Sequence, residues 1–168
     1  LEKFRIKLLY EKDLLGTAGT ISKNIDQFKD KDLMIIHCDN FTDFELNDLI
    51  NTHYSRPITC EVTMLTFKTE KPKQSGIVVT DKNDILIDYY EKVKNPPNKI
   101  ANAAIYIISQ KFLNNEYSKF NNAKEFTKDV IPYLMGKIFT FKTENFFIDI
   151  GDLESLKKAN VWASNNKF

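Results

Sequence analysis

The pattern of apolar and polar positions predicts one strand around which the rest of the chain can be arranged. Residues 33–36 are four consecutive large apolar residues, bounded by the polar segments 31–32 and 37–40. Such a short uninterrupted run is typical of a strand buried on both faces, as in the middle of a parallel sheet. Asp39 then falls where this strand ends, and open α/β sheets bind their ligands at the ends of strands.

Asp39 has a second interpretation, in which it begins a helix. Residues 44–53 have helical spacing and end close to Pro57. Four side chains just before this segment belong to types that cap helices, namely Asp39, Asn40, Thr42 and Asp43. The local pattern leaves both interpretations open.

The first part of the chain predicts two successive units of a strand followed by a helix. Residues 4–10 alternate as in a strand, residues 14–20 contain a glycine turn, and residues 21–28 resume with helical spacing. The strand at 33–36 and the helix at 44–53 make the second unit. Two such units in a row favour a parallel sheet.

The remainder of the chain is richer in strand signals. Residues 76–80 and 85–90 flank a turn signal at 81–84 and predict a hairpin. The other predicted strands are 58–67, 105–108, 138–142 and 146–150, and the other predicted helices are 110–120, 123–135 and 153–164. We therefore expect one α/β domain over residues 1–168, with a Rossmann-like, mixed and mainly parallel sheet, flanking helices and an inserted β-hairpin region.

Composition narrows the classes of function. The chain has 24 basic and 23 acidic residues and a net charge of +1, without a block of like charge, so nothing indicates nucleic acid or an anionic membrane as a partner. No apolar run approaches the ~20 residues of a membrane span. Cys38 and Cys60 have no companions at metal-binding spacing, which is typical of a reducing environment. We expect a cytoplasmic protein.

Asp149 repeats the setting of Asp39, because an apolar strand ends in a carboxylate just before Gly151. Carboxylates at the ends of two strands can hold one Mg²⁺, which needs only one or two protein carboxylates beside waters and phosphate oxygens. The alternative explanation is that Asp149 is a turn residue.

Two further segments could bind a ligand. Gly16 and Gly19 bracket a turn at a predicted helix N-terminus, where backbone N–H groups point outward and leave room for a base, sugar or phosphate. Glu91 and Lys92 follow an aromatic strand end, and a carboxylate can accept from sugar hydroxyls while an ammonium holds a phosphate. A plain turn and a solvated edge are the alternative explanations.

Six segments, taken in order, resemble the sugar-1-phosphate nucleotidylyltransferase family, which transfers NMP from an NTP to a sugar 1-phosphate and releases pyrophosphate. The segments are LLGTAGTI (14–21), HCDNFTDFELNDLINTH (37–53), SGIVV (75–79), YYEKVKNPP (89–97), ANAAIYIIS (101–109) and FFIDIGD (146–152). The glycine run and the segment after Glu91 look most like the heptose- and mannose-1-phosphate guanylyltransferase branch.

The resemblance implies a role for each matching residue. Asp39 and Asp149 would bind Mg²⁺ and, with Lys92, would be the catalytic residues. The substrate-binding residues that it implies are Gly16, Thr17, Gly76, Glu91, Lys92 and Asn102. It further implies an NTP, with GTP favoured, and a sugar 1-phosphate as partners, and a place in capsule or lipopolysaccharide biosynthesis. A missing opening strand and helix would leave part of the sheet uncovered, so we expect either a homo-oligomer that associates through this surface or a piece of a longer protein.

The chain departs from the family pattern at four positions. These are Cys38, where Gly or a small residue is usual, Ala103, where Gly is common, Phe147, where Trp is frequent, and Asp152, where Thr is usual. We expect Ala103 to narrow the sugar pocket and Asp152 to add negative charge near the metal site.

The family opens with a Gly-rich loop containing Arg and Lys that holds the triphosphate, and this chain has five glycines but no Gly-x-Gly. We therefore expect a family member without its first several dozen residues, and no appreciable pyrophosphate release by the chain alone.

Two other functions stay open. One is a non-catalytic nucleotide-sugar binding or regulatory module, and the other is a glycosyltransferase in which Asp39 and Asp43 form the metal motif.

Overall fold

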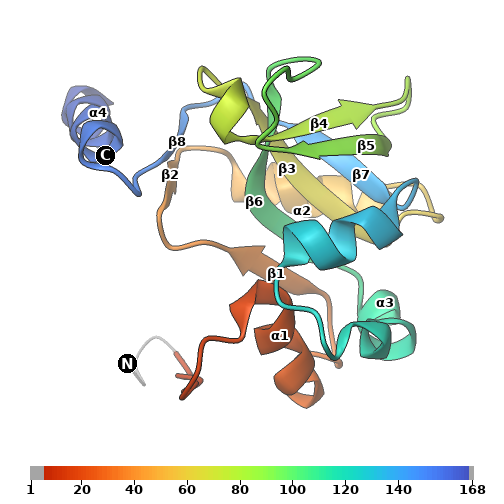
Figure 1. Ribbon diagram of the computed structural model, residues 1–168. Coiled ribbons are helices and arrows are strands. Elements are labelled where there is room, and N and C mark those ends of the chain that lie inside the picture. The colour runs from red at the N-terminus through yellow and green to blue at the C-terminus, as the bar shows by residue number, and fades with distance from the viewer. Residues whose placement is uncertain (1–5, 167–168) are drawn as a thin grey trace.

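A computed structural model describes residues 6–166 and confirms a mixed α/β fold with flanking helices (Figure 1). The strands are β1 (Leu33–Ile36), β2 (Asn40–Thr42), β3 (Val62–Lys68), β4 (Gly76–Thr80), β5 (Leu86–Glu91), β6 (Ile100–Ile108), β7 (Ile138–Lys142) and β8 (Phe147–Asp149). The α-helices are α1 (Gly16–Lys23), α2 (Leu46–Ser55), α3 (Gln110–Asn115) and α4 (Leu153–Asn166). Shorter helical turns are η2 (Ile25–Gln27), η3 (Pro72–Gln74), η4 (Tyr117–Phe120), η5 (Phe126–Val130) and η6 (Ile131–Leu134).

The main sheet is mixed and has β6 as its longest strand. Its order is β5-β4-β6-β3-β7, and β1 also pairs with β6. β3 and β7 run parallel, whereas β6 is antiparallel to β1, β3 and β4. The predicted hairpin is formed by β4 and β5, and its turn is fixed by Asp81, whose Oδ1 accepts from the backbone N–H groups of Asn83 and Ile85.

The interpretation of residues 33–36 as a central strand of a parallel sheet, buried on both faces, is wrong. Among the described residues β1 pairs only with β6, in antiparallel orientation, with Leu33 opposite Ile108. Its side chains are half-buried or exposed. A short apolar run has no periodicity that distinguishes a central strand from an edge strand, so this error could not be detected in the sequence.

The beginning of the chain also differs from expectation. Residues 6–10 form no strand, and Leu8 and Tyr10 are 74% and 88% exposed, while residues 4 and 5 of the predicted strand lie outside the described residues. A strand needs a partner, and none of the described residues pairs with this segment. Helix α1 begins at Gly16, inside the expected turn.

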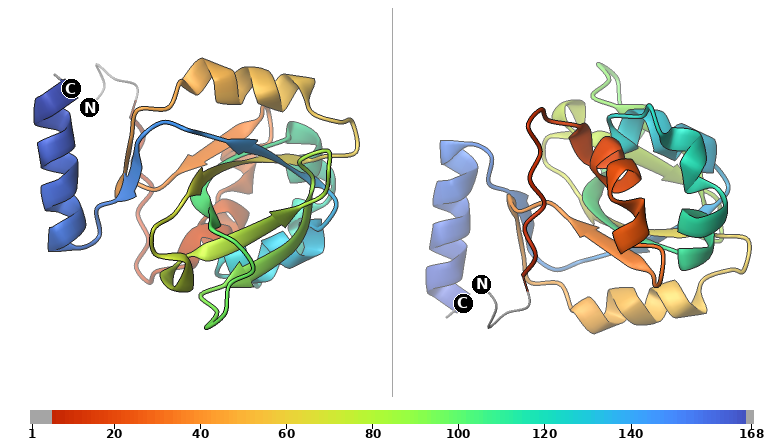
Figure 2. Two further views of the ribbon diagram at one scale, coloured as in Figure 1. Left: turned by 90° about the horizontal axis from the view of Figure 1, so that it is seen from above. Right: turned by 90° about the horizontal axis from the view of Figure 1, so that it is seen from below.

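Helices cover both faces of the sheet (Figure 2). On one face α1, α3 and η5 bury their apolar side chains against alternate residues of β3 and β6, including Met64 and Tyr106. On the other face Leu49 of α2 packs with Leu65 and Ile105. This arrangement follows from the two-residue period of a strand. The β2–β8 ribbon and α4 extend to the side of this body (Figures 1 and 2).

His53 joins α2 to the sheet and to the start of β1. It is 1% exposed, its Nδ1 lies 2.9 Å from the Thr63 hydroxyl, and its Nε2 lies 3.4 Å from a carboxylate oxygen of Asp32. Burial and the nearby Arg56 charge lower the pKa of His53 from 6.5 to about 4, although Asp32 acts in the opposite direction. The folded state therefore keeps this imidazole neutral.

We expect the stability of the protein to fall as the pH falls from 6.5 toward about 4. In this range the unfolded chain binds a proton at His53 and the folded chain does not, so the contribution is present above pH 6.5 and is lost on acidification. The loss approaches about 3 kcal/mol. Denaturant unfolding across this range should show a flatter pH dependence for His53→Gln, whereas His37→Gln, at an exposed histidine, should follow the wild type. Equal slopes for wild type and His53→Gln would contradict this assignment.

Candidate active site

The β2–β8 ribbon brings the two predicted metal-binding carboxylates together. Asn40 lies opposite Asp149 in this antiparallel pair, and the backbone N–H of Ile150 donates to the carbonyl oxygen of Asp39 at 2.9 Å. A Cβ added at Gly151 would lie 2.9 Å from Oδ1 of Asp149 and 4.0 Å from Oδ2 of Asp39. The two carboxylates thus lie beside the same small space, which the missing side chain of Gly151 keeps open.

The alternative interpretations of these two residues have different outcomes. Asp39 caps no helix, because α2 begins with Glu45 as its N-cap and has no side-chain cap. Asp149 is in part a turn residue, since its Oδ1 accepts from the N–H of Gly151 at 2.7 Å. Its side chain is nevertheless exposed, and that of Asp39 is exposed as well.

The two carboxylates fit a hard divalent cation such as Mg²⁺. Within residues 6–166 no group of three or more His, Cys, Asp or Glu side chains could hold a metal by itself. Two carboxylates are sufficient for Mg²⁺ where phosphate oxygens and waters complete its shell. The donor set therefore matches a metal that arrives with a phosphorylated ligand.

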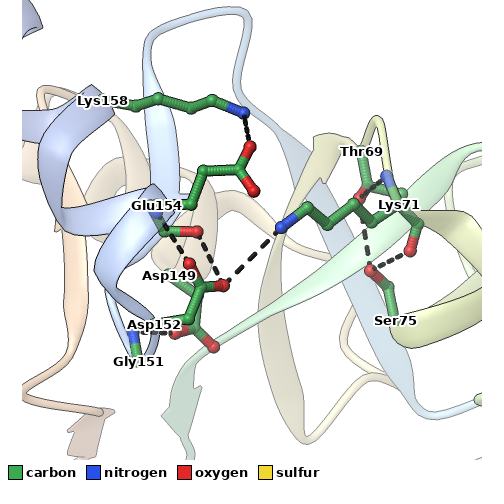
Figure 3. Close-up of polar contacts among 9 residues, drawn as sticks. Thr69, Lys71, Ser75, Asp149, Gly151, Asp152, Glu154 and Lys158 are labelled. Carbon is green, nitrogen blue, oxygen red and sulfur yellow. Dashed lines mark hydrogen bonds and ion pairs between the residues drawn. The ribbon is translucent and has the colours of Figure 1, made fainter.

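Asp152 follows the turn of Asp149 and Gly151, and its carboxylate contacts helix α4 and Lys71 (Figure 3). Its Oδ1 accepts from the backbone N–H of Ser155 at 2.8 Å, so it caps α4, and its Oδ2 lies 3.6 Å from Nζ of Lys71. Hydrogen bonds from the Ser155 backbone and hydroxyl, helped by Lys71, lower the pKa of this carboxyl. Asp152 is therefore a charged carboxylate whose hydrogen bonds and ion pair lie within the protein, and its effect on the proposed metal site stays a prediction.

A cavity of about 340 Å³ lies beside Asp149 and contains most of the predicted substrate-binding residues. It is lined by Thr17, His37, Asn40, Phe67, Gln74, Ser75, Gly76, Tyr89, Glu91, Lys92, Asn102, Ala103, Ala104, Tyr106, Glu125, Phe126, Thr127, Phe147 and Asp149. Thr17, Gly76, Glu91, Lys92, Asn102 and Asp149 are in this set, and Asp39 adjoins it through Asp149. Gly16 is not part of the lining.

Gly16 serves the packing of α1. Its φ is +73°, and an added Cβ would lie 2.4 Å from the backbone oxygen of Lys124. That same oxygen accepts from the N–H of Ala18 at 2.9 Å. The first turn of α1 is therefore held against the 124–125 backbone, and this contact places Thr17 at the cavity.

Gly76 leaves space for the side chains of Tyr89 and Glu91. It lies opposite Glu91 in the β4–β5 pair, and an added Cβ would be 1.9 Å from the Tyr89 hydroxyl and 2.9 Å from Oε2 of Glu91. A glycine is required here because two polar side chains occupy the position of its side chain.

Two non-glycine residues at the cavity have positive φ. Lys92 has φ +51° and Ala104 has φ +54°, a region that side chains rarely adopt and that is often found at ligand sites. The Lys92 side chain is exposed and, among the described residues, makes no ion pair. Ala103 also lines this cavity, although it is 2% exposed and packs in the cluster with Leu49. That it narrows the sugar pocket stays a prediction.

The sequence patterns did not single out Tyr89 or Tyr106. Both were counted only as strand residues, and both line the cavity. Burial raises the pKa of each phenol. A buried tyrosine hydroxyl usually has a hydrogen-bond partner, but the sequence does not identify that partner.

A sequence model of the nucleotidyl transferase family matches residues 2–166. This chain therefore belongs to the nucleotidyl transferase family. It is 26% identical over 157 residues to the glucose-1-phosphate adenylyltransferase of Thermotoga maritima, with 87% of this chain and 37% of that protein covered. Another glucose-1-phosphate adenylyltransferase, from Lachnospira eligens, is 27% identical over 154 residues, with 87% and 36% covered. The chain thus spans little more than a third of the length of these relatives.

Solved structures share the fold. A Bacillus anthracis protein assigned as a glucose-1-phosphate thymidylyltransferase, in complex with sucrose, superposes with a TM-score of 0.77 at 20% identity and covers 96% of this chain and 67% of that chain. HddC from Yersinia pseudotuberculosis gives a TM-score of 0.72 at 23% identity, with 89% and 63% covered. Its complex with GMP-PN gives 0.73 at 22%, with 90% and 64% covered. Within residues 6–166, no helix has the length and apolar character needed to span a membrane.

Proposed function

We propose that this chain is the substrate-binding part of a sugar-1-phosphate nucleotidyltransferase, which transfers NMP from an NTP to a sugar 1-phosphate and releases pyrophosphate. One observation carries the proposal: Asp149, adjacent to Asp39, lines the same cavity as Glu91 and Lys92. A phosphate-binding end and a hydroxyl-binding end in one cavity suit a ligand that is both a sugar and a phosphate. The glycosyltransferase alternative loses its basis, because the chain belongs to the nucleotidyl transferase family.

The roles of the residues follow from their chemistry. Asp39 and Asp149 would hold Mg²⁺, which when bound neutralises charge on phosphate oxygens. Lys92 would hold the sugar phosphate as a point charge, and Glu91 would accept from sugar hydroxyls. Fixing the sugar phosphate in this way aligns its oxygen with the α-phosphorus, and positioning of this kind is a large part of phosphoryl-transfer catalysis.

The finer substrates are also proposals. The resemblance of the Glu91 to Pro97 segment favours GTP with heptose or mannose 1-phosphate, for cytoplasmic synthesis of capsule or lipopolysaccharide precursors. The GMP-PN complex of HddC supports a guanine base, whereas the glucose-1-phosphate adenylyltransferases favour adenine. A calorimetric screen of GDP-, ADP-, dTDP-, UDP- and CDP-sugars with Mg²⁺ decides between them. Preferential binding of a sugar nucleotide other than a GDP-sugar would contradict the guanylyl assignment.

Lys92→Ala is expected to weaken sugar 1-phosphate binding about tenfold while changing NTP binding by less than about twofold, because its ammonium would contact only the sugar phosphate. Isothermal titration with each ligand measures both affinities. Lys94→Ala, an exposed lysine in the same loop, is the matched control and should bind as the wild type does. Equal losses of affinity for the two ligands in Lys92→Ala would mean that Lys92 does not contact the sugar phosphate.

Binding of nucleotide sugars by the intact protein, without pyrophosphate release from any NTP, would favour the non-catalytic module.

A further inference from the structure

Glu91 is connected to the floor of the cavity by a series of hydrogen bonds. The Tyr89 hydroxyl donates to Oε2 of Glu91 at 2.7 Å. Nδ2 of Asn102 lies 3.4 Å from the Tyr89 hydroxyl oxygen and donates to the Tyr106 hydroxyl at 2.6 Å. The series therefore runs from the buried Tyr106, which is 1% exposed, to the carboxylate proposed to bind the sugar.

The amide of Asn102 is used inside the protein. Its Oδ1 accepts from the backbone N–H of Ala104 at 2.9 Å, and its two amide hydrogens are accounted for by Tyr106 and Tyr89. Ala104 is the residue with φ +54°, at the place where the β3–β6 register shifts. Asn102 therefore holds the bulge and the two phenols.

Tyr89 fixes the position of one Glu91 oxygen. Burial raises the pKa of this phenol, so it remains a neutral donor. Its hydroxyl lies where a side chain at position 76 would be, so the glycine there makes room for the contact between Tyr89 and Glu91. Within residues 6–166 Oε1 of Glu91 accepts no hydrogen bond, so this second oxygen is available to a ligand.

We propose that Tyr89 is a positioning residue for the sugar-binding carboxylate. It holds Glu91 through one oxygen so that the other oxygen faces the sugar hydroxyls, and Asn102 supports Tyr89 in place of contacting the sugar. The proposal rests on the function proposed above, because it takes Glu91 as the residue that recognises the sugar.

A double-mutant cycle with Tyr89→Phe and Glu91→Ala tests the proposal. The probes are heptose 1-phosphate, mannose 1-phosphate and inorganic phosphate, and the phosphate alone reports on Lys92 without sugar contacts. Tyr89→Phe should weaken binding of the better sugar 1-phosphate about tenfold and leave phosphate binding within about twofold. Tyr90→Phe is the matched control, since Tyr90 is the next residue on β5, projects from the opposite side of the strand and does not line the cavity. The Tyr90→Phe variant should bind all three probes as the wild type does.

The cycle separates the positioning role from a purely structural one. In the Glu91→Ala background, Tyr89→Phe should cause no further loss of sugar 1-phosphate affinity, because Tyr89 would act only through Glu91. Additive losses in the double variant, or equal losses for sugar 1-phosphate and phosphate, would overturn the proposal for Tyr89 alone. A wild-type chain that binds phosphate but gains nothing from either sugar would overturn the proposed function, and the Tyr89 proposal with it.

Discussion

Asp39→Asn and Asp149→Asn should each weaken the Mg²⁺-dependent binding of a nucleotide sugar by about 100-fold or more. Each substitution removes one of the two carboxylate charges at the proposed cation, and even a partner that only orients a metal ligand is worth about 10- to 100-fold in affinity. The fold should survive, since both side chains are exposed and Asn at 149 keeps an acceptor for the N–H of Gly151.

Thermal unfolding with and without GDP-mannose and Mg²⁺ measures this effect, because a ligand that binds only the native state stabilises it by RT ln(1 + [L]/Kd). Asp152→Asn is the matched control. It lies in the same turn, and Asn retains the ability to cap α4. The stabilisation by ligand should disappear in the first two variants and persist in the control. Unchanged Mg²⁺ dependence for Asp39→Asn or Asp149→Asn would remove that residue from the metal site.

The sequence placed each of these two carboxylates at the end of a strand, but it did not show that the two lie close together. Each Asp follows a short apolar run, which places it at the end of a strand. Their proximity depends on the β2–β8 pairing between segments more than a hundred positions apart, and no local pattern encodes that contact. The resemblance to the nucleotidylyltransferases supplied the connection, and the geometry is consistent with it.

The fold class could be predicted from the sequence, but the edge strands of the sheet and the first residue of α1 could not. The hairpin of β4 and β5 was signalled by a turn between two β-branched runs, which is a local feature. Residues 33–36 and 6–10 were misjudged for a shared reason, because whether a strand lies at an edge or forms at all depends on its neighbours. The start of α1 was misjudged because glycine is a poor helix former, and its position here is set by the backbone at Lys124.

Gly16→Ala is expected to destabilise the protein by about 2 to 5 kcal/mol. A side chain at φ +73° costs about 1 to 2 kcal/mol by itself. The added Cβ would also lie 2.4 Å from the Lys124 backbone oxygen and 2.9 Å from its carbonyl carbon, so the 124–125 backbone or α1 would have to move. Overpacking against a backbone that cannot easily shift adds about 1 to 3 kcal/mol.

Gly136→Ala separates the two contributions, because Gly136 has nearly the same φ, +76°, but no atom within 4 Å of an added Cβ. Denaturant unfolding should show a loss of about 1 to 2 kcal/mol for this control. The excess loss in Gly16→Ala measures the contact between α1 and Lys124. Because that contact places Thr17 at the cavity, the affinity for nucleotide sugar should also fall in Gly16→Ala and not in Gly136→Ala. Equal destabilisation of the two variants would mean that the 124–125 backbone yields to the added methyl group and that Gly16 is needed only for its backbone conformation.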